Sequence, residues 1–169
     1  MILCTDADTL FPKNYLSETL TYFQKNPKIQ ACSIHFEHPL DQENSKEIIE
    51  YELHLRYYVE ALKYAKHPHA FHTIGSSMAV RSEAYQQQGG MNKRKAGEDF
   101  YFLHKLIPNG RFGDIVSTHT IPSPRLSDRV PFGTGKAMND QINQKGELLS
   151  YHPQIFEDLK LFLTKVPSF

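Results

Sequence analysis

Two pairs of acidic residues are the part of this sequence best suited to chemistry. Asp6 and Asp8 follow the short apolar run of residues 1–5, and Glu98 and Asp99 stand side by side much further along the chain. In open α/β sheets, ligands bind at the carboxyl ends of strands, which is where the first pair is expected. Two carboxylates at this spacing can share a divalent cation, because hard cations such as Mg²⁺ prefer oxygen ligands.

The second acidic pair stands at the start of a predicted helix. Its apolar residues recur at helical spacing and are Phe100, Leu103, Leu106 and Ile107. The macrodipole and the free backbone amides stabilise carboxylates in a first helical turn. Helix capping alone would therefore account for Glu98 and Asp99.

The hydrophobic pattern that surrounds these residues predicts an α/β fold. Residues 2–5 are expected to form a parallel strand buried on both faces, and residues 29–36 a second strand. Between them, Leu16, Leu20 and Phe23 form an apolar stripe that predicts a helix ending at Asn26-Pro27. Together these elements predict a βαβ start.

The longest predicted helix covers residues 45–66. One apolar seam runs along it and consists of Ile48, Tyr51, Leu55, Tyr58, Leu62 and Ala65. The seam predicts packing on the sheet or on another helix. Contact with a membrane surface or with another copy of the chain in an oligomer is the alternative, since tyrosines suit both environments.

Smaller features follow this helix. His67, His69 and His72 could ligate zinc, but no cysteine or carboxylate lies close by in sequence, so ordinary surface histidines are favoured. Ser82 is expected to cap a short helix closed by Gly89-Gly90. Residues 114–118 form a predicted strand. Residues 136–149 and 154–166 are predicted helices.

The segment of residues 121–136 is rich in Pro, Gly, Ser and Arg and shows no hydrophobic periodicity. Such loops in compact domains are usually functional or disordered. Arg125 and Arg129 could bind phosphates through their guanidinium groups. Gly133-Thr134-Gly135-Lys136 lacks the spacing of a phosphate loop and is weak evidence by itself.

Composition places the chain among ordinary globular domains. Its 169 residues are 40% hydrophobic and 22% charged, with 19 basic and 19 acidic residues. This balance favours no nucleic-acid partner. Cys4 and Cys32 lie in apolar runs and suit buried thiols in a reducing compartment. No signal peptide or membrane-spanning run is evident, which predicts a cytoplasmic location.

Four motifs, in this order, resemble those of the family-2 glycosyltransferases of the GT-A fold. They are residues 2–9 with Asp6-Ala7-Asp8, residues 75–81 with Gly75-Ser76-Ser77, Gly89-Gly90-Met91, and residues 96–102 with Glu98-Asp99. The resemblance covers about residues 1–136. It implies a Rossmann-like α/β fold with a mixed sheet and flanking helices.

The resemblance also implies roles for individual residues. Asp6 and Asp8 would hold Mn²⁺ or Mg²⁺ against the diphosphate of a nucleotide sugar. Asp99 would act as catalytic base beside Glu98. His119 would be a further metal ligand, and Arg125 and Arg129 would belong to a closing active-site loop. The side that takes a carbohydrate or lipid-linked acceptor would be lined by Gly75, Ser76, Ser77 and Gly90. A peripheral position at the inner membrane surface is the alternative to a location free in the cytoplasm.

The chain departs from the family pattern before Asp6, where members place the strands that hold the nucleotide. We therefore expect an incomplete GT-A fold: a metal- and acceptor-side half-domain over residues 1–136, then a helical segment over 137–169. On this reading the isolated chain transfers no sugar. The strand of residues 2–5 would present an open edge, which predicts pairing with a second copy.

Two alternatives belong to other functional classes. A non-catalytic module that binds a sugar or a partner could use the same truncated fold. A phosphatase of the haloacid-dehalogenase type is suggested by Asp6-Ala7-Asp8-Thr9, but that family has one more residue before the threonine. It also needs a downstream lysine that is not evident here.

Overall fold

A computed structural model describes residues 1–40, 45–92, 97–125, 133–144 and 149–166 of the chain, and it shows an α/β fold. Its sheet has four strands in the order β1-β3-β2-β4. The strands are β1 (Ile2–Cys4), β2 (Ala31–Phe36), β3 (Met78–Val80) and β4 (Phe112–Thr120). Strand β3 runs antiparallel to β1 and β2, whereas β2 and β4 are parallel. The predicted mixed sheet with flanking helices is confirmed.

The first strand differs from its predicted environment. β1 lies at an edge of the sheet, pairs antiparallel with β3, and its three residues are only partly buried. The expected parallel strand, buried on both faces, was wrong. The expected βαβ order is present, since α1 connects β1 to β2 and the two strands run in the same direction, but β3 lies between them in the sheet. An apolar run of this length predicts a strand but does not determine its partner.

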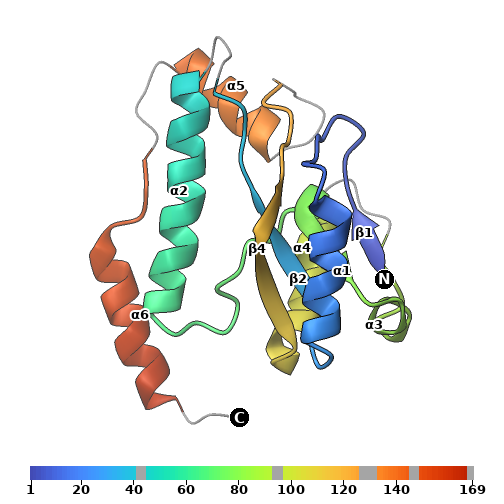
Figure 1. Cartoon of the computed structure of the whole chain (residues 1–169). Helices are drawn as coiled ribbons and strands as arrows, with labels where there is room; N and C mark the ends of the chain where they lie inside the picture. Colours follow the sequence, from blue (N-terminus) through green and yellow to red (C-terminus); the bar gives the residue numbers. More distant parts are fainter. Residues whose placement is uncertain (41–44, 93–96, 126–132, 145–148, 167–169) are drawn as a thin grey trace.

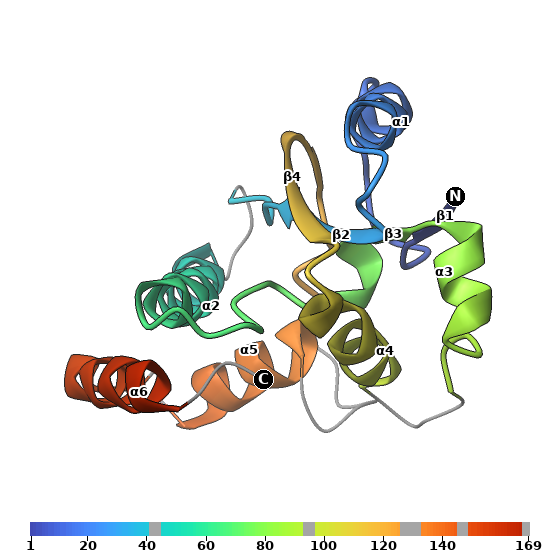
Figure 2. The same cartoon turned by 90° about the horizontal axis from the view of Figure 1, so that it is seen from below.

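Helices cover both faces of the sheet (Figure 2). Helix α1 (Tyr15–Lys25) lies on one face, and α4 (Glu98–Leu106) lies on the other. Helix α1 buries Tyr15, Thr19 and Phe23 against the sheet, together with Cys32, Ile34, Ala79 and Ile115. Leu16 and Leu20, which were predicted to face the core, are 64% and 49% exposed. The buried face of α1 is therefore rotated away from the predicted stripe.

Shorter elements complete this part of the fold. Helix α3 (Ser82–Gln87) follows β3, and the one-turn 3₁₀ helices η1 (Gly75–Ser77) and η2 (Ile107–Asn109) precede β3 and β4. The predicted strand of residues 114–118 is longer than expected, since β4 runs from Phe112 to Thr120. A second core cluster lies under α3 and α4, with Met78, Val80, Phe102 and Leu103 fully buried.

A separate layer of helices stands beside the sheet. Helix α2 (Ser45–Tyr64) packs against α5 (Thr134–Gln144) and α6 (Pro153–Lys165), and α6 is outermost (Figures 1 and 2). The predicted seam of α2 is buried at Ile48 and Leu62, and Ala65 just beyond the helix is buried as well. Tyr58 remains 38% exposed. Tyr51, Leu55, Tyr58 and Leu62 of the seam also line the cavity described below.

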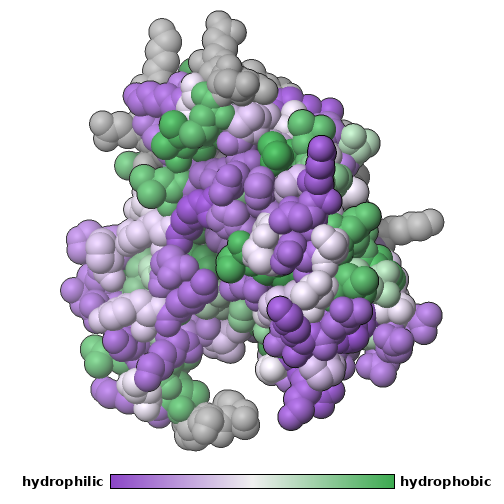
Figure 3. Space-filling view, viewed as in Figure 1, coloured by the Kyte–Doolittle hydropathy of each residue, from purple (hydrophilic) through white to green (hydrophobic). Residues whose placement is uncertain are grey.

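The surface carries no single large apolar face in the view of Figure 3. That face is mostly hydrophilic, and its hydrophobic side chains gather in separate patches. None of the described helices combines the length and the apolar character needed to cross a membrane.

Candidate functional site

A cavity of about 1190 Å³ extends between the carboxyl end of β1, the start of α4 and the helical layer. Its lining includes Asp6, Asp8, Glu98 and Asp99, so the fold brings the two acidic pairs to one cavity. The pairs are far apart in sequence. The two pairs lie close together because α4 begins near the end of the sheet at which β1 terminates.

The Asp99 carboxyl group lies against the backbone of Phe100 and Gly75. Its Oδ1 accepts a hydrogen bond of 2.7 Å from the Phe100 amide, and the Gly75 amide also bonds to it. A Cβ atom at Gly75 would stand 2.8 Å from Asp99 Oδ2, so residue 75 has no room for a side chain. The family resemblance placed Gly75 on the acceptor side, and in the structure Asp99 takes the space that a side chain at residue 75 would need.

Burial raises the pKa of Asp99, and the neighbouring charge of Glu98 raises it further. The backbone hydrogen bonds act in the opposite direction and offset part of this increase. A carboxyl with a raised pKa accepts a proton more readily than an exposed one. This suits a general base, although buried structural carboxyls show the same property.

Arg125 reaches the first acidic pair. Its Nε lies 2.9 Å from Asp8 Oδ2, although β4, which precedes it, is at the opposite edge of the sheet from β1. The chain crosses the strand ends because Leu10 and Ile121 form a β-bridge. The guanidinium therefore balances a charge of the D-x-D motif.

Only some of the residues predicted on the acceptor side line the cavity. Gly75 and Ser76 line the cavity. Ser77 is buried and shares a 2.6 Å hydrogen bond with Thr120 Oγ1, which ties η1 to β4. Gly90 has a φ of +72° and lies against the Tyr85 ring, outside the cavity lining.

The two remaining predicted residues are His119 and Arg129. His119 is part of β4, paired in register with His35, rather than beyond the end of a strand, and it does not line the cavity. Arg129 lies outside the described residues. Within the described ranges, no group of three or more His, Cys, Asp or Glu side chains has the geometry of a metal site.

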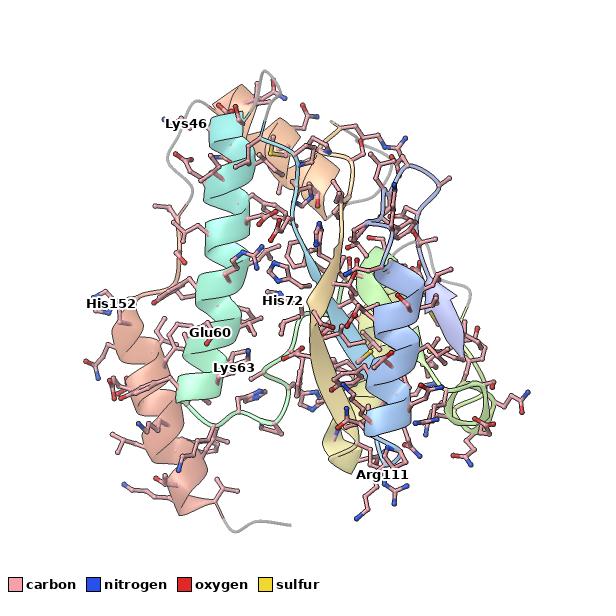
Figure 4. All side chains as sticks on the ribbon, in the orientation of Figure 1. Lys46, Glu60, Lys63, His72, Arg111 and His152 are labelled. Atoms are coloured by element: carbon pink, nitrogen blue, oxygen red, sulfur yellow. The ribbon has the colours of Figure 1, made fainter. Side chains whose placement is uncertain are left out.

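The histidine group has a different setting from the one expected. His69 stacks on His104 with ring centroids 4.2 Å apart, and both line the cavity with His67. His72 lies between α2 and the sheet (Figure 4). Burial first, and then the nearby Arg56 charge, lower the pKa of His72 to about 4. His72 is therefore neutral at physiological pH, and these histidines are part of the cavity wall instead of ordinary surface residues.

One group of residues was missed in the sequence. His38 lines the cavity and bonds Glu52, which in turn bonds Arg56. The available signal was the position of His38, two residues after β2, as Asp6 stands two residues after β1. The pairing with Glu52 could not be anticipated, because it depends on how α2 is placed beside the sheet.

Comparison with known families gives one match. Residues 1–145 match the family described as "Glycosyl transferase family group 2". No curated protein matches the chain. The matched span contains all the predicted site residues and extends through α5.

Proposed function

Because the chain belongs to glycosyl transferase family group 2, we propose that its cavity serves sugar transfer from a nucleotide sugar to an acceptor hydroxyl. The observation that carries the proposal is the placement of Asp99. A partly buried carboxyl with a raised pKa stands in one cavity with the Asp6 and Asp8 carboxylates. A sugar transferase needs these two groups: a base for the acceptor and an anchor for the donor.

Asp99 acts as the general base in this proposal. Its carboxylate takes the proton of the acceptor hydroxyl while the hydroxyl oxygen forms a bond to the anomeric carbon of the donor. The bond from that carbon to the diphosphate breaks, and the nucleoside diphosphate leaves with the electron pair. Attack opposite the leaving group inverts the anomeric configuration. Glu98 assists by raising the pKa of Asp99.

Asp6 and Asp8 would hold a divalent cation, Mn²⁺ or Mg²⁺, together with diphosphate oxygens. Two carboxylates are an incomplete ligand set for such ions, which fits a site completed by the donor. The bound cation would stabilise the negative charge of the leaving diphosphate.

Arg125 holds Asp8 while no cation is bound. Its side chain is 59% exposed, and an exposed ion pair of this kind contributes at most about 1 kcal/mol. A divalent cation can therefore displace Arg125 from Asp8. The released guanidinium is then free to bind a phosphate oxygen.

Calorimetry of Mn²⁺ binding, with and without UDP or GDP, tests the proposal. We expect weak binding of Mn²⁺ alone and tighter binding with the nucleotide, and we expect Asp8→Ala to remove that enhancement. Arg125→Ala should strengthen binding of Mn²⁺ alone, because the competing cation is gone, and weaken the enhancement by the nucleotide.

Asp158→Ala is the matched control, since Asp158 is an exposed carboxylate of α6 outside the cavity lining. It should bind like the parent chain. Unchanged binding in Asp8→Ala would contradict the proposal. Normal binding of metal and nucleotide, with no transfer by a complete enzyme that contains this segment, would instead favour a non-catalytic binding module.

A further inference from the structure

The His38 ring is held rigidly at the end of β2. Its backbone amide and its Nδ1 both bond to Glu52 Oε1, at 2.6 and 2.8 Å. Arg56 Nη2 donates to Glu52 Oε2 at 2.6 Å and to the Phe36 carbonyl at 2.7 Å. The His38 side chain is only 2% exposed. These contacts fix the ring orientation without using its second nitrogen.

The contacts also determine which nitrogen is free. Burial by itself would raise the pKa of Glu52, but the hydrogen bonds from His38 and Arg56 lower it to about 2. Glu52 is therefore a carboxylate at neutral pH and can only accept hydrogen bonds. Nδ1 of His38 must carry the hydrogen, which leaves Nε2 for other partners. Nε2 is buried and has no hydrogen-bond partner in the part of the chain that the structure describes.

Strand order places His38 relative to the rest of the site. The carboxyl ends of β1 and β2 lie at the same end of the sheet, and the antiparallel β3 starts at that end, between them. The D-x-D motif follows β1, Gly75 with its contact to Asp99 precedes β3, and His38 follows β2. Since neighbouring strands are about 4.8 Å apart, β1 and β2 are separated by roughly 10 Å. Asp99 therefore lies at this end of the sheet, between the D-x-D motif and His38.

We infer that His38 Nε2 is a binding contact for a hydroxyl group of an uncharged acceptor sugar. The inference rests on the proposed function, which places the donor at Asp6 and Asp8 and the base at Asp99. An acceptor must then lie on the other side of Asp99 from the donor, where His38 lines the cavity.

The chemistry around His38 favours a neutral hydroxyl over an anion. On the neutral His38 ring with its hydrogen on Nδ1, Nε2 presents a lone pair, which a hydroxyl can satisfy by donating and which would repel a phosphate or carboxylate oxygen. Arg56 is already bound to Glu52 and the Phe36 carbonyl, and His72 is neutral. The nearby lining side chains Phe36, Tyr51 and Leu55 offer apolar surface to the C–H faces of a sugar ring.

Nitrogen NMR of the full chain, labelled with ¹⁵N-histidine, tests the inference directly. The probes are the methyl pyranosides of glucose, galactose and mannose, with glycerol as a hydroxyl control. We expect at least one glycoside to shift the His38 Nε2 resonance at concentrations where glycerol does not. Methyl glucuronoside, which carries a carboxylate, should shift it less.

Two variants give an independent measurement of glycoside affinity. His38→Gln should weaken binding about 3- to 10-fold, the loss expected for one hydrogen bond. His35→Gln is the matched control: His35 lies on β2, which His38 follows, bonds Glu37, and does not line the cavity. Its affinity should be unchanged.

The outcomes separate this inference from the proposed function. If no glycoside moves the Nε2 resonance while Mn²⁺ with UDP or GDP still binds, the His38 inference is overturned and the proposed function stands. A buried water on Nε2 would give that result. If the nucleotide fails to bind as well, both fail. A larger shift with the glucuronoside would overturn the preference for an uncharged sugar.

Discussion

Asp99 is in a position that lowers the stability of the folded chain at neutral pH. Its pKa is raised above 3.8, the ordinary value, because the carboxyl is buried, so folding favours the protonated form. The free energy of unfolding therefore falls as pH rises from the pKa of the unfolded chain through the raised pKa of the folded one. Above that window the loss is constant. An aspartate that served only as a helix cap would show the opposite sign.

Asp99→Asn should consequently separate activity from stability. Asparagine keeps an oxygen for the Phe100 amide but cannot take a proton, so turnover of a complete enzyme should fall by about 10²- to 10⁴-fold. The melting temperature at pH 7 should rise slightly, and its pH dependence near the Asp99 titration should disappear. Scanning calorimetry across pH, together with a transfer assay, measures both effects.

Glu98→Gln is the comparison variant, and it should cost less activity than Asp99→Asn. In the parent enzyme, activity should rise with pH through the raised pKa of Asp99. Intact activity in Asp99→Asn, combined with a lower melting temperature, would show that Asp99 is only a helix cap.

At the scale of elements, α1 was predicted correctly as a helix, but the face of it that packs on the core was predicted incorrectly. Three apolar residues at helical spacing predicted the helix, but only Phe23 of the three is buried, at 4% exposure. The core contact comes from Tyr15, Thr19 and Phe23, and Thr19 satisfies its own hydroxyl by donating to the Tyr15 carbonyl at 2.7 Å. A polar residue with an internal partner can thus occupy a buried position that a hydrophobic pattern does not detect.

Substitutions on the two faces of α1 should differ accordingly. Phe23→Ala should lower the free energy of unfolding by about 3 kcal/mol, because it leaves a cavity beside Ile34 and Ala79. Leu16→Ala should change it by less than about 0.5 kcal/mol, as expected for an exposed site. Urea denaturation of both variants measures the difference. Equal losses would mean that Leu16 is covered in solution, for example by a second copy of the chain.

At the scale of the whole molecule, a sheet with its helices α1, α3 and α4 stands beside a layer of α2, α5 and α6. The sheet core includes fully buried residues on β2 and β3, whereas α6 buries only Phe156 among its described side chains. Arg56 and Glu52 connect α2 to the end of β2, next to the cavity. The layer is therefore attached to the sheet in part through groups of the candidate site.

Hydrogen exchange should resolve these two parts. Amides of β2 should exchange only through global unfolding, and those of α6 at least about 10-fold faster through local opening. Mass spectrometry of exchanged peptides measures both rates. Phe156→Ala should accelerate exchange in α6 and leave β2 unchanged, and parallel acceleration in both would show a single cooperative unit.

The sequence by itself determined the α/β class, most helices and strands, and the family resemblance, because these depend on local periodicity and on short motifs. The roles of Asp6, Asp8, His119 and Arg129 at a metal or phosphate remain predictions, and Arg129 lies outside the described residues.

Only the tertiary structure decided which groups meet. Strand β3 lies between β1 and β2, Leu16 of α1 is exposed, and Arg125 pairs with Asp8 although it follows the strand at the opposite side of the sheet. The link from His38 through Glu52 to Arg56 arises from the placement of α2, and no spacing in the sequence encodes it. Hydrophobic periodicity reports that a residue is buried, whereas pairing and side-chain contacts depend on the relative positions of elements far apart in the chain.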